Sequence, residues 1–194
     1  MRPGLDVWCG GPQLARSVGA LILRSDNPLT DALAEVTGRY DVVFVDCPPA
    51  LGPLIDAALL AANLLIVPVR TDHASLHGLE MIGDRFREVR PESSGAELLG
   101  ITIFDVSRRA TALSSEVARS IRAGFGDPHP RILPAIRRSE RAAFEMRASG
   151  RVAHEYAAAN PSSASAASLA DGYEALALQV LEVLEVLWDQ PAGR

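Results

Sequence analysis

The residue with the clearest chemical context is Asp46, which follows four apolar residues, Val42 to Val45, and precedes the prolines at positions 48 and 49. The apolar run predicts a short buried strand, so the aspartate would stand at the carboxyl end of that strand, before a rigid turn. Carboxylate oxygens are ligands that Mg²⁺ prefers. We therefore treat Asp46 as a candidate catalytic and metal-binding residue, although an aspartate in this setting also serves as a turn or helix-capping residue.

All nineteen basic residues are arginines, and they are spread unevenly along the chain. Residues 85–151 hold thirteen arginines against eight acidic residues, whereas the segments on either side are acidic. A basic surface can contact the phosphates of DNA without reading base sequence. The candidate DNA contacts are Arg119, Arg122, Arg137, Arg138, Arg141 and Arg147. The alternative is that these side chains lie on solvated helix faces and pair with Glu116, Glu140 and Glu145.

Composition limits the other kinds of chemistry. The four histidines have neither metal-ligand spacing nor a nucleophile partner, and the two cysteines are too few for a disulfide framework or a zinc site. The chain has no apolar run of the roughly 20 residues that a transmembrane helix requires, and its first residues do not resemble a signal peptide. We therefore predict a cytoplasmic protein without a membrane partner, folded as a single domain over residues 1–194.

Short runs rich in valine, isoleucine and leucine alternate with segments of helical period, which is the pattern of βαβ units. This pattern predicts an α/β fold with a mostly parallel sheet flanked by helices. The continuous apolar runs at 42–45 and 64–69 predict strands that are covered on both faces. Further strands are predicted at 98–104, 5–8 and 132–133.

Helices are predicted from apolar spacing and from the residues that start and stop them. Pro28 is a good first-turn residue, and it starts a helix that ends before Gly38. Pro91 stops a second helix, whose apolar residues run from Leu76 to Val89. Other helices are predicted at 113–125 and about 170–188, and the serine- and alanine-rich stretch 160–168 is predicted to be a loop or frayed turn that leads into the last helix.

The stretch from Tyr40 to Ala74 resembles the switch region, and the strand after it, of ParA/MinD-type deviant Walker ATPases. The similarity rests on Asp46, Pro48-Pro49, Leu51-Gly52, a helix at 54–62 and the strand at 65–69, followed by Ser75, Gly78 and Leu79. It continues with Gly100 to Phe104 followed by Asp105 and Arg108, and with Pro134, Arg137, Arg138, Ser139 and Glu140. The resemblance thus covers nearly the whole chain in order.

The resemblance implies a P-loop NTPase-like fold and a partition ATPase that acts in plasmid or chromosome segregation. Its cofactors would be ATP and Mg²⁺, with Asp46 at the metal. The nucleotide contacts that the resemblance implies are Asp46, Pro48, Asp105, Arg108 and Pro134. Its partners would be non-specific DNA of the nucleoid, a ParB-like adaptor protein, and a second copy or a full-length homologue in a dimer.

One departure from the family pattern concerns the phosphates of the nucleotide. ParA-type ATPases hold them with a glycine-rich loop whose lysine contacts phosphate, and this chain contains no lysine. We therefore expect a chain that is truncated at its N-terminus, lacks the first strand and the phosphate loop, and is incomplete for ATP hydrolysis. The alternative is an ATPase-inactive module for DNA binding or dimerisation. A membrane-positioning relative of the MinD type fits less well, because the last helix is acidic and anionic lipid would repel it.

Overall fold

The computed structural model describes residues 4–11, 27–36, 38–89, 96–106, 119–122, 124–125 and 131–189. The chain divides into two compact units. The first unit comprises Met1–Asn63 and Val89–Ala96, and the second comprises Leu64–Glu88 and Glu97–Arg194. The single domain expected over residues 1–194 stays a prediction.

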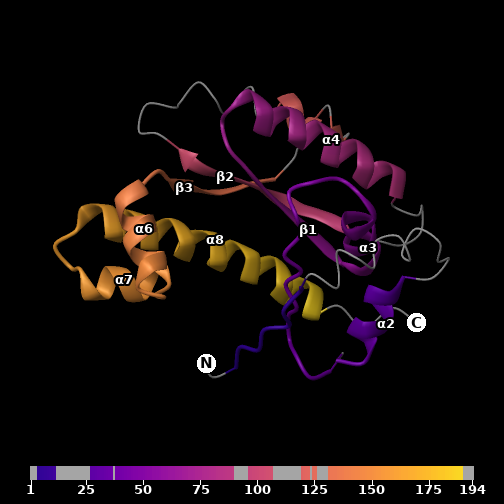
Figure 1. Cartoon of the computed structure of the whole chain (residues 1–194), viewed down its shortest axis with the longest axis horizontal. Coiled ribbons are helices and arrows are strands. Elements are labelled where there is room, and N and C mark those ends of the chain that lie inside the picture. Colours follow the sequence, from indigo (N-terminus) through magenta and orange to yellow (C-terminus); the bar gives the residue numbers. More distant parts are fainter. Residues whose placement is uncertain are drawn as a thin grey trace. The chain divides into compact units, whose positions relative to one another are not determined.

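The second unit is built on a parallel sheet (Figure 1). Its strands are β1 (Leu64–Val69), β2 (Glu97–Val106) and β3 (Ile132–Arg137), in the order β1-β2-β3. Five consecutive residues of β2, from Leu99 to Ile103, are buried, as expected for a central strand that is covered on both faces. The strands predicted at 64–69, 98–104 and 132–133 are confirmed, and the predicted α/β fold with a parallel sheet is confirmed with them.

The strand β3 continues through Pro134, although proline removes one donor from the ladder of hydrogen bonds. The register between β2 and β3 shifts at this place, between Thr102 and Phe104. The Thr102 hydroxyl, which is buried, donates a hydrogen bond of 2.8 Å to the Pro134 carbonyl oxygen. A side chain thus supplies a link between the strands where the backbone pairing is irregular.

Helices lie on both sides of this sheet, with α4 (His73–Val89) on the side opposite α8 (Ala164–Trp188) in Figure 1. The buried residues of α4 recur at helical spacing: Leu76, Leu79, Gly83 and Phe86. The ring of Phe86 packs against that of Phe125, with centroids 5.7 Å apart. The described part of the predicted helix 113–125 is helical at 119–122 and 124–125, and the rest lies outside the described residues.

Three helices cover the other side: α6 (Glu140–Ala148), α7 (Ala153–Ala159) and α8. They share a core with β3, made by Ile136, Ala142, Ala153, Tyr156, Ala166, Leu169 and Ala170. The helix α8 begins at Ala164, six residues before its predicted start, so the loop predicted at 160–168 is wrong over its second half. The reason is local, because the Ser163 side chain accepts a hydrogen bond from the Ala166 amide and alanines, which favour helix, follow it.

The first unit contains the short helices α2 (Pro28–Ala34) and α3 (Pro53–Ala61), and each begins with a proline, as the sequence predicts for α2. The Asn27 side chain joins them: it accepts a hydrogen bond from the Leu29 amide at 3.1 Å and donates one to the Ala57 carbonyl oxygen at 2.8 Å. The strands predicted at 42–45 and 5–8 are not formed. Both stretches are irregular and, apart from the half-buried Val42, exposed, and no described strand supplies either with the backbone partners that a strand requires.

Within the described residues, none of the helices has the length and apolar character needed to cross a bilayer.

Candidate functional site

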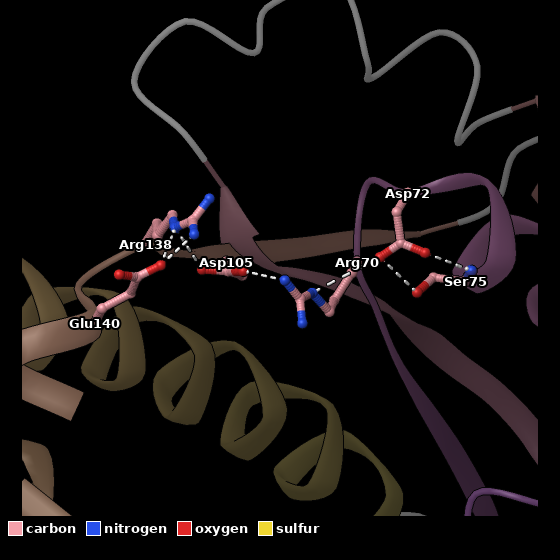
Figure 2. Close-up of polar contacts among 6 residues, drawn as sticks. All are labelled: Arg70, Asp72, Ser75, Asp105, Arg138 and Glu140. Atoms are coloured by element: carbon pink, nitrogen blue, oxygen red, sulfur yellow. Dashed lines mark hydrogen bonds and ion pairs between the residues drawn. The ribbon is translucent and has the colours of Figure 1, made fainter. Parts of the chain in front are cut away.

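Charged side chains meet at the carboxyl edge of the parallel sheet in the second unit (Figure 2). Arg70 directly follows β1, Asp105 is the next-to-last residue of β2, and Arg138 directly follows β3. Nη2 of Arg70 donates to Oδ2 of Asp105 at 2.5 Å, and Nε of Arg138 lies 3.6 Å from Oδ1 of the same carboxylate. Arg138 also pairs with Glu140, at 3.0 Å from its Nε. We call Arg70, Asp105, Arg138 and Glu140 the strand-end cluster.

The topology explains why these residues meet. In a parallel sheet the carboxyl ends of all strands lie at one edge, and ligands of open α/β folds bind outside that edge. Consecutive strands β1, β2 and β3 are also neighbours in space, so residues at their ends are close although they are far apart in sequence. The cluster therefore occupies the edge of the sheet where such folds place their ligand sites.

The backbone of Asp105 is unusual. Its φ is 61°, and it is the only described residue other than glycine with a positive φ. Phe104 pairs with Ile136 and Val106 with Arg137, so Asp105 is an extra residue in β2 with no partner in the register. This is a β-bulge, and bulges change the direction in which a side chain points. The bulge explains how one carboxylate in β2 reaches arginines on both neighbouring strands.

Arg70 is held on the other side by Asp72, which directly precedes α4, and by the ring of Phe104 in β2. Its Nε lies 3.7 Å from Oδ2 of Asp72, and its guanidinium carbon lies 5.9 Å from the centre of the Phe104 ring. Asp72 itself caps α4, because its carboxylate accepts hydrogen bonds from the Ser75 amide at 2.9 Å and from the Ser75 hydroxyl at 3.1 Å. The Ser75 amide is the main cause that lowers the pKa of Asp72 below its ordinary value. Asp72 is therefore an anionic neighbour of Arg70.

The pair of Arg138 and Glu140 lies at the start of α6. The hydrogen bond from Arg138 lowers the pKa of Glu140, and the same contact raises the pKa of Arg138. Both side chains are largely exposed to solvent. Exposed pairs of this kind stabilise a fold only weakly, so a competing charged ligand can displace them.

The five residues predicted to contact nucleotide fall in different places. Asp105 is in the strand-end cluster, and Pro134 lies in β3 with its carbonyl oxygen bound to Thr102. Arg108 lies outside the described residues. Asp46 and Pro48 are exposed residues of the irregular stretch 42–48 in the first unit. Their roles at a nucleotide stay predictions.

A metal site made only of protein side chains is not formed in the described part of the chain. No three histidine, cysteine, aspartate or glutamate side chains of those residues gather as metal ligands would. The Mg²⁺ expected at Asp46 does not require such a group. Magnesium is commonly held by one or two carboxylates together with water and the phosphates of a substrate. An exposed Asp46 carboxylate fits that mode of binding.

The six arginines predicted to contact DNA are all exposed. Arg138 pairs with Glu140 and Asp105, and Arg141 donates to Glu145 at 2.8 Å within α6. Pairing with Glu140 and Glu145 is the alternative interpretation of these residues, and it describes Arg138 and Arg141 in this structure. Arg137 is the last residue of β3, and Arg147 is in the last turn of α6.

The sequence marks Arg70 as an arginine that can approach a phosphate, but it does not place Arg70 among the predicted site residues. The sequence indicates only its position. Arg70 directly follows the predicted strand 64–69, so it lies at the carboxyl edge of the sheet. Its contact with Asp105 could not be predicted, because the bulge that turns the carboxylate toward it has no clear sequence marker.

Comparison with solved structures identifies the fold. The structure resembles the cobyrinic acid a,c-diamide synthase of Mycobacterium smegmatis with bound ADP and magnesium, with a TM-score of 0.54 and 28% sequence identity. The similarity covers 72% of this chain and 61% of that one. A second structure of the same enzyme, with a bound ATP analogue and magnesium, matches equally well. The chain thus has the α/β fold of P-loop ATPases.

Sequence comparison identifies the family more closely. Residues 13–97 match a family model described as an AAA domain. The chromosome partitioning protein ParA of Caulobacter vibrioides is 33% identical over 150 residues, which are 73% of this chain and 55% of that protein. The chromosome-partitioning ATPase Soj of Treponema pallidum is 33% identical over 99 residues, which are 51% of this chain and 39% of that protein. The chain is therefore a homologue of the ParA and Soj partitioning ATPases, as its sequence motifs predict, and it spans about half the length of ParA.

Proposed function

We propose that this chain acts in DNA partition as a ParA-type protein that binds ATP and Mg²⁺ and assembles as a nucleotide-dependent dimer on DNA of any sequence. The observation that carries this proposal is the homology to ParA over 73% of the chain, in a fold shared with a protein that binds ADP and magnesium. The proposed setting is the nucleoid in the cytoplasm. A ParB-like adaptor protein is the proposed partner that stimulates the ATPase.

The proposed nucleotide contacts are those implied by the family motifs. Asp46 would hold Mg²⁺ directly or through water, with Pro48 fixing the turn after it. Asp105, Arg108 and Pro134 would lie near the base of the nucleotide. ATP supplies the bond that is cleaved, and Mg²⁺ supplies positive charge that neutralises the phosphates of ATP. The residues of this chain bind and orient them.

Hydrolysis by these residues alone is expected to be slow. Phosphoryl transfer depends mainly on positioning and neutralising the negative charge of the phosphates, and in ParA-type proteins a lysine of the phosphate loop does much of this. The chain contains no lysine, and a guanidinium does not readily replace a lysine within a tight phosphate loop. This composition favours the second candidate function, an ATPase-inactive module that binds DNA or pairs with a full-length homologue.

Nucleotide binding separates the two candidates. We would measure the affinity of the chain for a fluorescent ATP analogue, with and without Mg²⁺, and repeat the measurement with Asp46→Asn. Magnesium-dependent binding that is lost in Asp46→Asn supports the nucleotide-binding protein. Retained DNA binding without any affinity for ATP would support the inactive module. The matched control is Asp41→Asn, which makes the same change of charge five residues earlier in the same exposed part of the first unit.

DNA binding tests the proposed partner. The double variant Arg137→Ala/Arg147→Ala should weaken binding to all DNA sequences about equally, because contacts to phosphate carry no sequence information. The slope of log affinity against log salt concentration should become shallower by about 0.9 for each phosphate contact that is lost. The control is Arg85→Ala/Arg87→Ala, which removes the same charge from α4. Equal effects of the two double variants would reject a DNA-binding surface at β3 and α6.

A further inference from the structure

The strand-end cluster has a feature that neither the fold nor the homology explains. Two guanidinium groups from different strands converge on one carboxylate, and each of its oxygens faces a different arginine (Figure 2). The Asp105 side chain is 22% exposed, whereas those of Arg70 and Arg138 are 50% and 52% exposed. The carboxylate is thus partly covered between two arginines that solvent, or a ligand, can reach.

Stabilisation of the fold is a weak explanation for this arrangement. Exposed ion pairs contribute little to stability. Asp105 also has a positive φ within a bulge of β2, a conformation that is uncommon for residues other than glycine, although aspartate and asparagine adopt it more readily than most. Unfavourable backbone conformations of this kind are concentrated at binding and switching sites. The bulge serves to present the Asp105 carboxylate to the two arginines.

We propose that Asp105 is an internal substitute for a phosphate group, and that Arg70 and Arg138 together bind the phosphate of a ligand when it displaces the Asp105 carboxylate. Guanidinium groups recognise carboxylates and phosphates with the same paired hydrogen bonds, so one can replace the other. The phosphate comes either from a free polyphosphate or from a DNA backbone. Binding of a DNA backbone rests on the proposed function, whereas binding of a free polyphosphate does not.

The charges near the cluster determine how it would operate. Asp105, Glu140 and Asp72 all lie within ion-pair distance of the two arginines, so negative charges outnumber positive ones while Asp105 is in place. The closed cluster therefore repels anions. When Asp105 turns away, the arginines are exposed to a phosphate that carries more charge than a carboxylate. The contact of Asp105 with Arg70 and Arg138 is thus autoinhibitory.

The unmodified chain provides the first test. Pyrophosphate is titrated into the protein, and the side-chain nitrogen NMR signals of the arginines are followed. The signals of Arg70 and Arg138 should shift together and saturate, whereas that of Arg87, which pairs with Asp84 on the exposed side of α4, should not. A uniform drift of all arginine signals, or no shift at Arg70 and Arg138, would overturn the proposal. This test needs no substitution and so does not depend on the folding of a variant.

Substitution provides the second test. Asparagine tolerates the left-handed conformation, so Asp105→Asn removes the charge while retaining the bulge. We expect Asp105→Asn to bind pyrophosphate about fivefold more tightly than the unmodified chain, as expected for the loss of two weak competing ion pairs. The control Asp84→Asn changes the net charge equally and should have no such effect. Adding Arg70→Gln to Asp105→Asn should abolish the gain. A gain that survives Arg70→Gln, or equals that of Asp84→Asn, would contradict the proposal.

A short DNA duplex distinguishes the source of the phosphate. If Asp105→Asn strengthens binding of both pyrophosphate and the duplex, and Arg70→Gln reverses both effects, the ligand is the DNA backbone. If only pyrophosphate responds, the ligand is a free polyphosphate. If the unmodified chain does not bind the duplex at all but the pyrophosphate tests succeed, the proposed DNA function fails while the autoinhibitory cluster stands. If Asp105→Asn changes the affinity for pyrophosphate and for the duplex no more than Asp84→Asn does, the proposal for the strand-end cluster is wrong. The proposed DNA function is not affected by that result.

Discussion

Nη2 of Arg70 lies 2.5 Å from Oδ2 of Asp105, although the two residues are 35 positions apart in the sequence. The contact connects the ends of β1 and β2 at the edge of the sheet where α/β folds bind ligands. Asp105 also faces Arg138 at the end of β3, so the three strand ends are joined through one carboxylate. This relationship is the basis of the proposed autoinhibition by the strand-end cluster.

Two glycines of α4 should respond in opposite ways to alanine. A Cβ added at Gly83 would lie 2.5 Å from the carbonyl carbon of Gly124, whereas one added at Gly78 would meet nothing within 4 Å. Gly83→Ala should lower the free energy of unfolding by about 1–3 kcal/mol, because the two backbones must separate. Gly78→Ala should raise it by up to about 1 kcal/mol, because alanine favours helix. Urea denaturation measures both values, and equal effects would show that α4 does not pack against Gly124.

The hydroxyl of Thr102 should contribute to the pairing of β2 with β3. Thr102→Val keeps the shape of the side chain but leaves the Pro134 carbonyl oxygen without this donor. We expect a loss of about 1 kcal/mol in the free energy of unfolding, the usual net value of one hydrogen bond. Thr102→Ser, which keeps the hydroxyl, is the control for the donor. A Thr102→Val chain as stable as the unmodified one would mean that this hydrogen bond contributes nothing.

The start of α8 should depend on Ser163. Its side-chain oxygen accepts a hydrogen bond of 3.3 Å from the Ala166 amide, which has no partner within the helix. Ser163→Ala should lower the free energy of unfolding by about 1 kcal/mol, and Ser163→Asp should restore it. Thermal denaturation followed by circular dichroism measures the change. If Ser163→Asp were no better than Ser163→Ala, the serine would not act as a cap.

The contact between α6 and α7 should be sensitive to pH. Glu145 accepts hydrogen bonds from the Tyr156 hydroxyl and from Arg141, and these contacts lower its pKa below the ordinary value of 4.5. A carboxylate whose pKa is lower in the folded state stabilises the fold above the unfolded pKa, and this contribution is lost as the pH falls through the folded pKa. Stability should therefore decrease as the pH is lowered below about 4.5, and Glu145→Gln should reduce that decrease.

The contact between Glu145 and Tyr156 should also weaken at high pH. The hydrogen bond to Glu145 raises the pKa of Tyr156 above 10.0, so its contribution is present below that pH and is lost as the pH rises through the raised value. Tyr156→Phe should remove this alkaline dependence and the hydrogen bond together. Denaturant midpoints measured across the pH range test both variants. Glu88→Gln, which removes one carboxylate from the exposed pair with Arg85 on α4, serves as the control for charge. If the stability of the unmodified chain changed neither at low pH nor at high pH, the contact between Glu145 and Tyr156 would not stabilise the fold.

Much of the framework was predictable from local patterns. The apolar runs identified the parallel strands, and the spacing of Leu76, Leu79, Gly83 and Phe86 identified the buried face of α4. Pattern alone failed for Val42 to Val45, because an apolar run becomes a strand only where a neighbouring strand accepts its backbone hydrogen bonds, and no described strand does so. It failed also for the start of α8, because the serine-rich pattern that predicts a loop contains Ser163, which caps the helix.

The order of the motifs and the periodicity of the side chains are local properties, and they predict the resemblance to ParA-type ATPases, the strands β1, β2 and β3, and the residues at the ends of these strands. The shared contact of Arg70 and Arg138 with the carboxylate of Asp105 is visible only in the folded chain. Contacts between strand ends depend on the register of the sheet. A single extra residue in β2 turns the Asp105 side chain toward both neighbours, and no local pattern specifies that turn.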